Sequence, residues 1–106
     1  MATGRLGIAD LSAAADTSLY TVPADTFAVV TVSLCNRSTG TRSVRIAVAD
    51  AATPTNAEYI EYDADILANG VLERTGIVMD AGKILVVRAD STLVSAVAYG
   101  IETSTA

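Results

Sequence analysis

The feature that most constrains this chain is a succession of short strand-like runs, which return about every eight to twelve residues between turn signals. In residues 26–36 (TFAVVTVSLCN), Val30, Val32 and Leu34 alternate with small polar residues, and residues 42–49 (RSVRIAVA) repeat the alternation. A period of two places every second side chain on the same face of a strand. The pattern predicts antiparallel sheets and no helix longer than a turn or two.

Turn-forming residues separate the predicted strands. Pro23 cannot donate a hydrogen bond to a sheet ladder, and both residues of Asn69-Gly70 tolerate positive φ. We therefore expect Asn69-Gly70 to form the tight turn of a hairpin and Gly76 to mark a bulge or bend. The predicted strands are residues 18–22, 26–36, 42–49, 57–63, 64–68, 71–79, 83–90 and 93–101.

The fold class follows from the number and kind of these strands. A chain of 106 residues has the size of one domain. Seven to eight short strands, each with an apolar face to bury, favour an all-β fold, a single antiparallel β-sandwich. The sequence leaves its topology open between jelly-roll and immunoglobulin-like. We expect the sandwich to span residues 18–102, after an N-terminal arm (1–17) and before a polar C-terminal tail (103–106). The weak hydrophobic pattern of residues 1–17 also fits a short helical turn or a first edge strand.

The composition excludes several kinds of functional site. The chain has no His and a single Cys, which excludes His-ligated zinc, Ser–His and Cys–His nucleophile pairs, thiolate clusters and an intramolecular disulfide. A net charge of −5 without a basic patch disfavours nucleic-acid binding. No segment approaches the ~20 apolar residues that a membrane span needs. The first residues also lack the pattern of a secretory signal, so we expect a soluble protein made in the cytoplasm.

Carboxylates are the remaining candidates for chemistry. Asp63 and Asp65, with Glu58 and Glu61 nearby, could chelate calcium, but their spacing lacks the alternating oxygen ligands and central Gly of a calcium loop. A paired-carboxylate glycosidase built from the same residues would find little room for a substrate cleft in so small a domain. We therefore predict no metal, no cofactor, no catalytic residue and no enzymatic activity.

Two strands are apolar on both faces, in residues 26–30 and 84–87. A two-sheet domain buries only one face of each strand, so another copy or another part of the chain has to cover the surplus apolar surface. Cys35, further along the first of these strands, is expected to be a small buried hydrophobe with an unreactive thiol. The candidate interface residues are Phe27, Val29, Leu85 and Val87.

Several segments follow one another in an order that resembles small structural proteins of tailed-bacteriophage virions. The segments are SLYTVPADTFAVV, VSLCNRS, SVRIAVAD, EYIEYDADILANGVLERTGIVMDAGKILVVRAD and VSAVAYGIE, and they cover about residues 17–102. The ordered set is similar to modules found in phages of cyanobacteria and of other aquatic bacteria.

The resemblance implies a non-enzymatic building block of the virion. A chain that consists of this one module favours a capsid cement (decoration) protein on the capsid surface, with the major capsid protein as its partner. The surplus apolar surface of residues 26–30 and 84–87 predicts that this protein forms a homo-oligomer, for example a trimer at a local three-fold of the shell. A neck, tail or fibre-associated structural protein is the alternative. The resemblance also implies that Asn36 and Arg37 fix a strand end through side-chain hydrogen bonds to the backbone.

A carbohydrate-binding module is the main rival from another class of protein. Such a module needs an exposed aromatic platform or a calcium site. The chain has no Trp, and alternation along residues 57–63 predicts Tyr59 and Tyr62 on opposite faces of one strand, which would leave only a weak platform.

Overall fold

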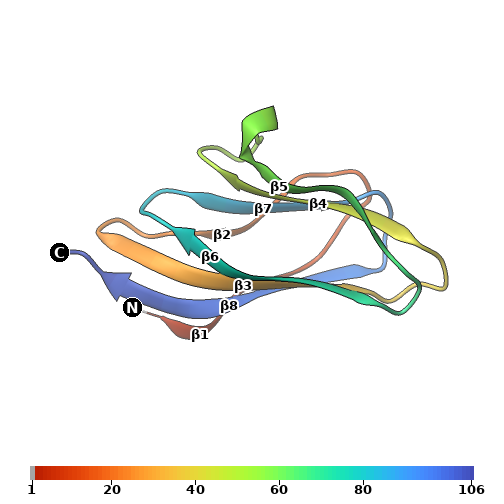
Figure 1. The fold of residues 1–106 in the computed structure, drawn as a ribbon, viewed down its shortest axis with the longest axis horizontal. Coiled ribbons are helices and arrows are strands. Elements are labelled where there is room, and N and C mark those ends of the chain that lie inside the picture. The colour runs from red at the N-terminus through yellow and green to blue at the C-terminus, as the bar shows by residue number, and fades with distance from the viewer. Residues whose placement is uncertain (1) are drawn as a thin grey trace.

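The alternating segments form eight strands in the computed structural model, which describes residues 2–106 and confirms the all-β class (Figure 1). A 3₁₀ turn, η1 (Asn56–Glu58), precedes β5. The strands are β1 (Thr3–Asp10), β2 (Thr17–Thr21), β3 (Thr26–Asn36), β4 (Arg42–Ala49), β5 (Tyr59–Ile66), β6 (Val71–Met79), β7 (Ile84–Ala89) and β8 (Val94–Ser104).

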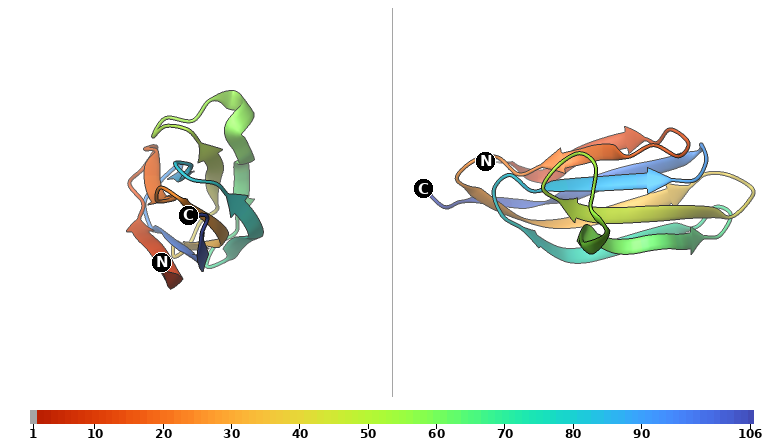
Figure 2. Two further views of the ribbon diagram at one scale, coloured as in Figure 1. Left: turned by 90° about the vertical axis from the view of Figure 1, so that its left-hand side faces the viewer. Right: turned by 90° about the horizontal axis from the view of Figure 1, so that it is seen from above.

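The strands make two four-stranded sheets that pack face to face. Sheet A has the order β1-β8-β3-β6, and sheet B has the order β2-β7-β4-β5. The pairs β1–β8, β2–β7, β3–β6 and β4–β5 are all antiparallel, as they would be if one long hairpin were rolled up on itself. This is the jelly-roll topology, which the sequence had left open. Both termini lie at the same end of the sandwich (Figure 2).

The core fills the space between the sheets with inward-facing aliphatic side chains. Val30, Val32 and Leu34 of β3 are fully buried, and so are Val44 and Ile46 of β4 on the opposite sheet. The predicted alternation of these two strands is therefore confirmed. Each fully buried Val, Leu or Ile contributes about 1.5–3 kcal/mol relative to an exposed one, which makes this layer the main source of stability.

Residues 3–10 form an edge strand of the sandwich, so the expected separate N-terminal arm is wrong. β1 pairs with β8 along its length, and Leu6 and Ala9 pack against the core. The Arg37 side chain forms an ion pair with Asp10 at the end of β1, instead of the expected hydrogen bond to the backbone. The expected C-terminal tail is also too long, because β8 continues through Ser104.

The Asn69-Gly70 turn connects the two sheets and is not the turn of a hairpin. β5 lies in sheet B and β6 in sheet A, so the chain crosses the sandwich here. The Gly70 amide donates to the Leu67 carbonyl oxygen at 2.9 Å, and Asn69 carries the positive φ of 59°. Gly70 is needed for space, because an added Cβ would lie 2.9 Å from the Leu67 oxygen. The predicted bulge at Gly76 is confirmed by its φ of 67° and a register shift in the β3–β6 pairing.

The buried side chain of Asn36 ties the crossing to β3. Its Nδ2 group donates to the carbonyl oxygens of Gly40 at 2.8 Å, Ile66 at 2.9 Å and Leu67 at 3.2 Å. Its Oδ1 accepts hydrogen bonds from the Ser38 amide at 2.9 Å and hydroxyl at 2.6 Å. The side chain is 0% exposed, and the role implied for it at a strand end is confirmed.

Asn36→Ala is expected to lower the free energy of unfolding by about 2–4 kcal/mol, because buried carbonyl groups lose their donor and a void remains. Asn56→Ala, at an exposed position of η1, is the matched control and should change it by less than about 0.5 kcal/mol. Urea denaturation of both variants measures the difference. Equal effects at the two sites would contradict the role given to Asn36.

A second polar tie joins the sheets near the chain termini. The Tyr20 hydroxyl of β2 donates to Glu102 Oε2 of β8 at 2.5 Å, and the Ala2 amide donates to Glu102 Oε1 at 2.8 Å. Both Tyr20 and Glu102 are buried. The hydrogen bonds from Tyr20, first, and from Ala2 hold the pKa of Glu102 below its ordinary value of 4.5. Burial, first, and then the hydrogen bond with Glu102 raise the pKa of Tyr20.

Glu102→Gln should cost about 1–2 kcal/mol of stability at neutral pH, because a charge-assisted hydrogen bond is lost. The folded-state pKa of Glu102 is lower than its unfolded value, so its stabilisation is fully present above about pH 4.5 and is lost as the pH falls through the folded-state pKa. The difference between wild type and variant in urea denaturation should therefore shrink below about pH 4.5. A difference that stays constant with pH would show that the carboxylate charge does not contribute.

Candidate protein interface

The outer face of sheet A is apolar along much of its length. Val29 in the centre of the sheet has Ile101 of β8 on one side and Val78 of β6 on the other. These three side chains are 40%, 55% and 70% exposed, respectively. Six of the nine exposed large hydrophobic residues in the described chain belong to this face. The six are Ile8, Val29, Val71, Val78, Tyr99 and Ile101.

Charged groups on this face lie toward its edges. Arg5 and Asp10 are on the edge strand β1, and Glu73 is on the opposite edge strand β6. The Tyr99 hydroxyl of β8 donates to Glu73 Oε2 at 2.8 Å, so the Tyr99 side chain reaches across β3. This hydrogen bond, first, and then desolvation raise the pKa of Tyr99. A face with an apolar centre and charges at its rim has the composition of a protein interface.

Only half of the interface residues expected from the sequence lie on this face. Phe27 is half-buried and Val29 exposed there, whereas Leu85 and Val87 are fully buried in the core and cannot take part in an interface. The pairing of Val87 with Ile46 turns this part of β7 inward. The opposite side of β7 is also covered by the chain itself, where Val86 packs in a cluster with Ala47, Ala49, Tyr59 and Ile84.

Sequence reasoning missed the contributions of β6 and β8 to this face. Val78 and Ile101 occupy outward positions beside buried residues of the same strands. In β8 the inward positions are filled by Ala96 and Ala98, and the larger Tyr99 faces out. This distribution of sizes, with small residues inside and large ones outside, is the signal that could have identified the face.

Cys35 lies on the same face, and not in the core where it was expected. It is half-buried between Val71 of β6 and Ser95 of β8, because its neighbours Leu34 and Asn36 point inward. The reactivity of its thiol stays a prediction. Its position makes it a natural reporter of whether this face is covered.

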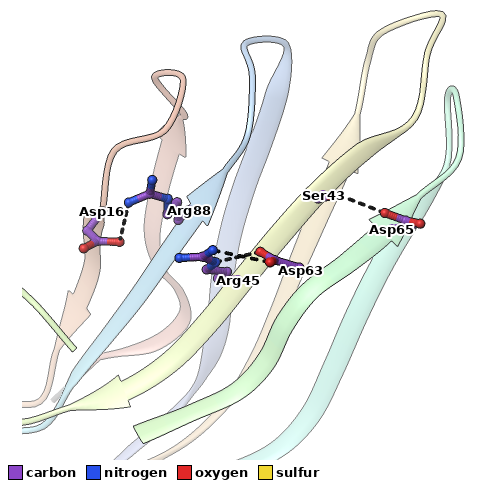
Figure 3. Close-up of polar contacts among 6 residues, drawn as sticks. All are labelled: Asp16, Ser43, Arg45, Asp63, Asp65 and Arg88. Atoms are coloured by element: carbon purple, nitrogen blue, oxygen red, sulfur yellow. Dashed lines mark hydrogen bonds and ion pairs between the residues drawn. The ribbon is translucent and has the colours of Figure 1, made fainter. Parts of the chain in front are cut away.

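The outer face of sheet B is polar and internally ion-paired (Figure 3). Arg45 and Arg88 are cross-strand neighbours on β4 and β7. Arg45 Nε lies 2.7 Å from Asp63 Oδ1, and Arg88 Nη1 lies 3.8 Å from Asp16 Oδ1. The hydrogen bond from Arg45 holds the pKa of Asp63 below its ordinary value. Each arginine is matched by its own carboxylate, so the row presents little net charge to a ligand.

The carboxylates considered for calcium bind separate partners. Asp63 is held by Arg45, and Asp65 accepts a hydrogen bond from the Ser43 hydroxyl at 2.9 Å. Glu61 forms an ion pair with Arg74, and Glu58 accepts hydrogen bonds from backbone amides. Within residues 2–106, no group of three or more His, Cys, Asp or Glu side chains is arranged to hold a metal ion.

Tyr59 and Tyr62 meet on one face of sheet B, so their expected placement on opposite faces is wrong. Their ring centroids are 5.0 Å apart in an edge-to-face arrangement, and the Arg45 guanidinium lies 4.1 Å from the Tyr62 centroid. Irregularities in the β4–β5 register, with Asp63 at a φ of 52°, break the simple alternation. The two rings and Asn56 line an open hollow of about 460 Å³.

The described part of the chain contains no helix long and apolar enough to cross a membrane. No family model matches the sequence, and neither a curated protein nor a solved structure does.

Proposed function

We propose that the protein is a non-enzymatic structural protein of a bacteriophage virion, a capsid cement protein that stabilises the shell. The observation that carries the proposal is the apolar outer face of sheet A, where Val29, Val78 and Ile101 form a continuous exposed row. Apolar surface that is removed from water contributes about 25 cal/mol per Å². Covering this face in an assembly would therefore stabilise both the protein and whatever it binds.

Three further observations support this proposal. The jelly-roll topology is common among viral capsid domains, although the fold by itself does not determine a function. The charged side chains Arg45 and Arg88 on sheet B are already paired with carboxylates of the same chain, so they do not call for a charged ligand. The ordered segments from SLYTVPADTFAVV to VSAVAYGIE resemble virion proteins over most of the chain. The same observations apply to a neck, tail or fibre-associated protein, which differs mainly in copy number and partner.

Capsids of the encoding phage that lack the protein provide the direct test. The purified full chain should bind them saturably, at a copy number fixed by the shell symmetry, and should raise the temperature at which they break open. Val78→Asp, which places a charge in the apolar row, should abolish binding because the carboxylate would lose its water. Leu67→Asp is the matched control, because Leu67 is 72% exposed in the β5–β6 connection and should tolerate the change.

The two structural roles give different results in this experiment. Binding of only a few copies, at one vertex or on the tail, would replace the cement role by the neck or tail alternative. No binding to capsids or tails would overturn the structural proposal altogether.

A carbohydrate-binding module is a second candidate, favoured by the hollow beside Tyr59 and Tyr62. Sugar rings stack on aromatic faces, and Asn56 and the neighbouring arginine would supply hydrogen-bond donors. Glycan-array binding that is lost in Tyr62→Ala and kept in Val78→Asp would favour this function over the structural one.

A further inference from the structure

We propose that the outer face of sheet A is covered by the same face of a second copy, related by a two-fold axis that runs along the strands. This inference deepens the proposed function, because it names the partner of the face on which that function rests. The dimer would then be the unit that joins the virion.

The edge charges of the face are complementary under this symmetry. The position of each charge along the strands can be measured on β3. Arg5 is level with Thr31 of β3, because both residues pair with Tyr99 of β8. Glu73 of β6 pairs with Ser33, which is two residues further along β3. A two-fold axis along the strands places the β1 edge of one copy over the β6 edge of the other. Arg5 and Glu73 of different copies are then offset by about 7 Å along the strands, and each dimer contains this pairing twice.

Contacts within the chain leave both Arg5 and Glu73 able to bind a group of the second copy. Arg5 is exposed and makes no ion pair with any of residues 2–106. Among residues 2–106, Tyr99 is the one side chain that donates to Glu73, so the Glu73 carboxylate keeps a free oxygen for a guanidinium from the second copy. Because the offset is similar to the length of an Arg side chain, the two groups can meet at the rim of the interface.

The area of the face fits a stable dimer. Sheet A is four strands wide, and its two central strands are 11 residues long. At about 4.8 Å per strand and 3.3 Å per residue, the face covers roughly 700 Å². A standard specific interface buries about 600–1,000 Å² on each partner, and one whole face against another falls within this range.

The symmetry of the assembly follows from the number of suitable surfaces. A closed ring of three copies, as expected from the sequence, needs two different complementary patches on every copy. On the outer face of sheet B, Arg45 and Arg88 form ion pairs and Val86 is buried by residues of the same chain. Sheet A therefore has the one extended apolar outer face among the described residues. A single patch that covers itself gives a two-fold dimer.

Sedimentation equilibrium of the purified full chain tests this dimer. The wild type should be a dimer, Val78→Asp a folded monomer by circular dichroism, and Leu67→Asp a dimer like the wild type. The thiol of Cys35 should be labelled slowly in the wild type at dimeric concentrations and faster in Val78→Asp. Wild-type protein that is monomeric or trimeric, or equal labelling rates in the two proteins, would overturn the inference.

A charge exchange tests the predicted orientation of the two copies. Arg5→Glu and Glu73→Arg should each weaken the dimer about tenfold or more, since each brings like charges together twice. The double variant should regain most of the lost affinity, which a purely structural effect of either substitution would not do. Single variants without effect, or a double variant that is weaker than both, would rule out this two-fold arrangement.

The outcomes separate the dimer from the proposed function. If the protein is a monomer that still binds capsids, the cement role stands and the outer face of sheet A contacts the shell instead of a second copy. A dimer that binds neither capsids nor tails would keep the interface and overturn the role in the virion.

Discussion

A two-sheet sandwich has one interior, so each strand can bury only one of its faces within the domain. Each sheet is therefore left with an outer face, and the two outer faces of this protein differ in how their apolar residues are covered. Sheet B covers its outward apolar residues with Tyr59 and Ile84 and pairs its arginines with carboxylates. Sheet A keeps an apolar outer face around Val29, with no part of the described chain packed over it. The molecule therefore has one face suited to solvent and one suited to a partner.

Polar ties hold the two sheets in a fixed relation without interrupting the aliphatic core. Asn36 satisfies the carbonyl groups of the crossing between β5 and β6, and the Tyr20–Glu102 pair joins β2 to β8 near the termini. Buried polar groups of this kind are costly unless all their hydrogen bonds are formed, so they favour a single register of the sheets. A rigid sandwich presents its outer face with a constant shape, which an assembly interface requires.

The sequence alone predicted the strands whose hydrophobic alternation is visible within the strand itself. Alternation along β3 and β4 correctly predicted Val30, Val32 and Ile46 in the core. The strand β1 was only one of three possibilities for residues 1–17, because its pairing with β8 depends on residues almost a hundred positions away and its own hydrophobic pattern is weak. Leu85 was assigned to the wrong surface because the run 84–87 is apolar on both faces, and only the pairing with β4 decides which one turns inward.

Backbone irregularities explain why the site residues were harder to predict than the fold. Tyr59 and Tyr62 share a face because the β4–β5 register shifts between them, and a period of two cannot anticipate such a shift. Asn69-Gly70 has the residues of a hairpin turn, but the strands that it joins belong to different sheets. The outer face of sheet A is contributed by strands far apart in the sequence, so it became recognisable only once the sheet order was known.

Hydroxyl-radical footprinting of the unmodified protein tests the central claim most directly, because each sheet carries its own exposed tyrosine. Tyr99 on sheet A is 38% exposed and Tyr62 on sheet B is 57% exposed. Passing from the dilute monomer to the dimer should protect Tyr99 from oxidation and leave Tyr62 as reactive as before. Protection of Tyr62 with Tyr99 unchanged would show that the working surface is sheet B and would contradict the assignment of the interface to sheet A.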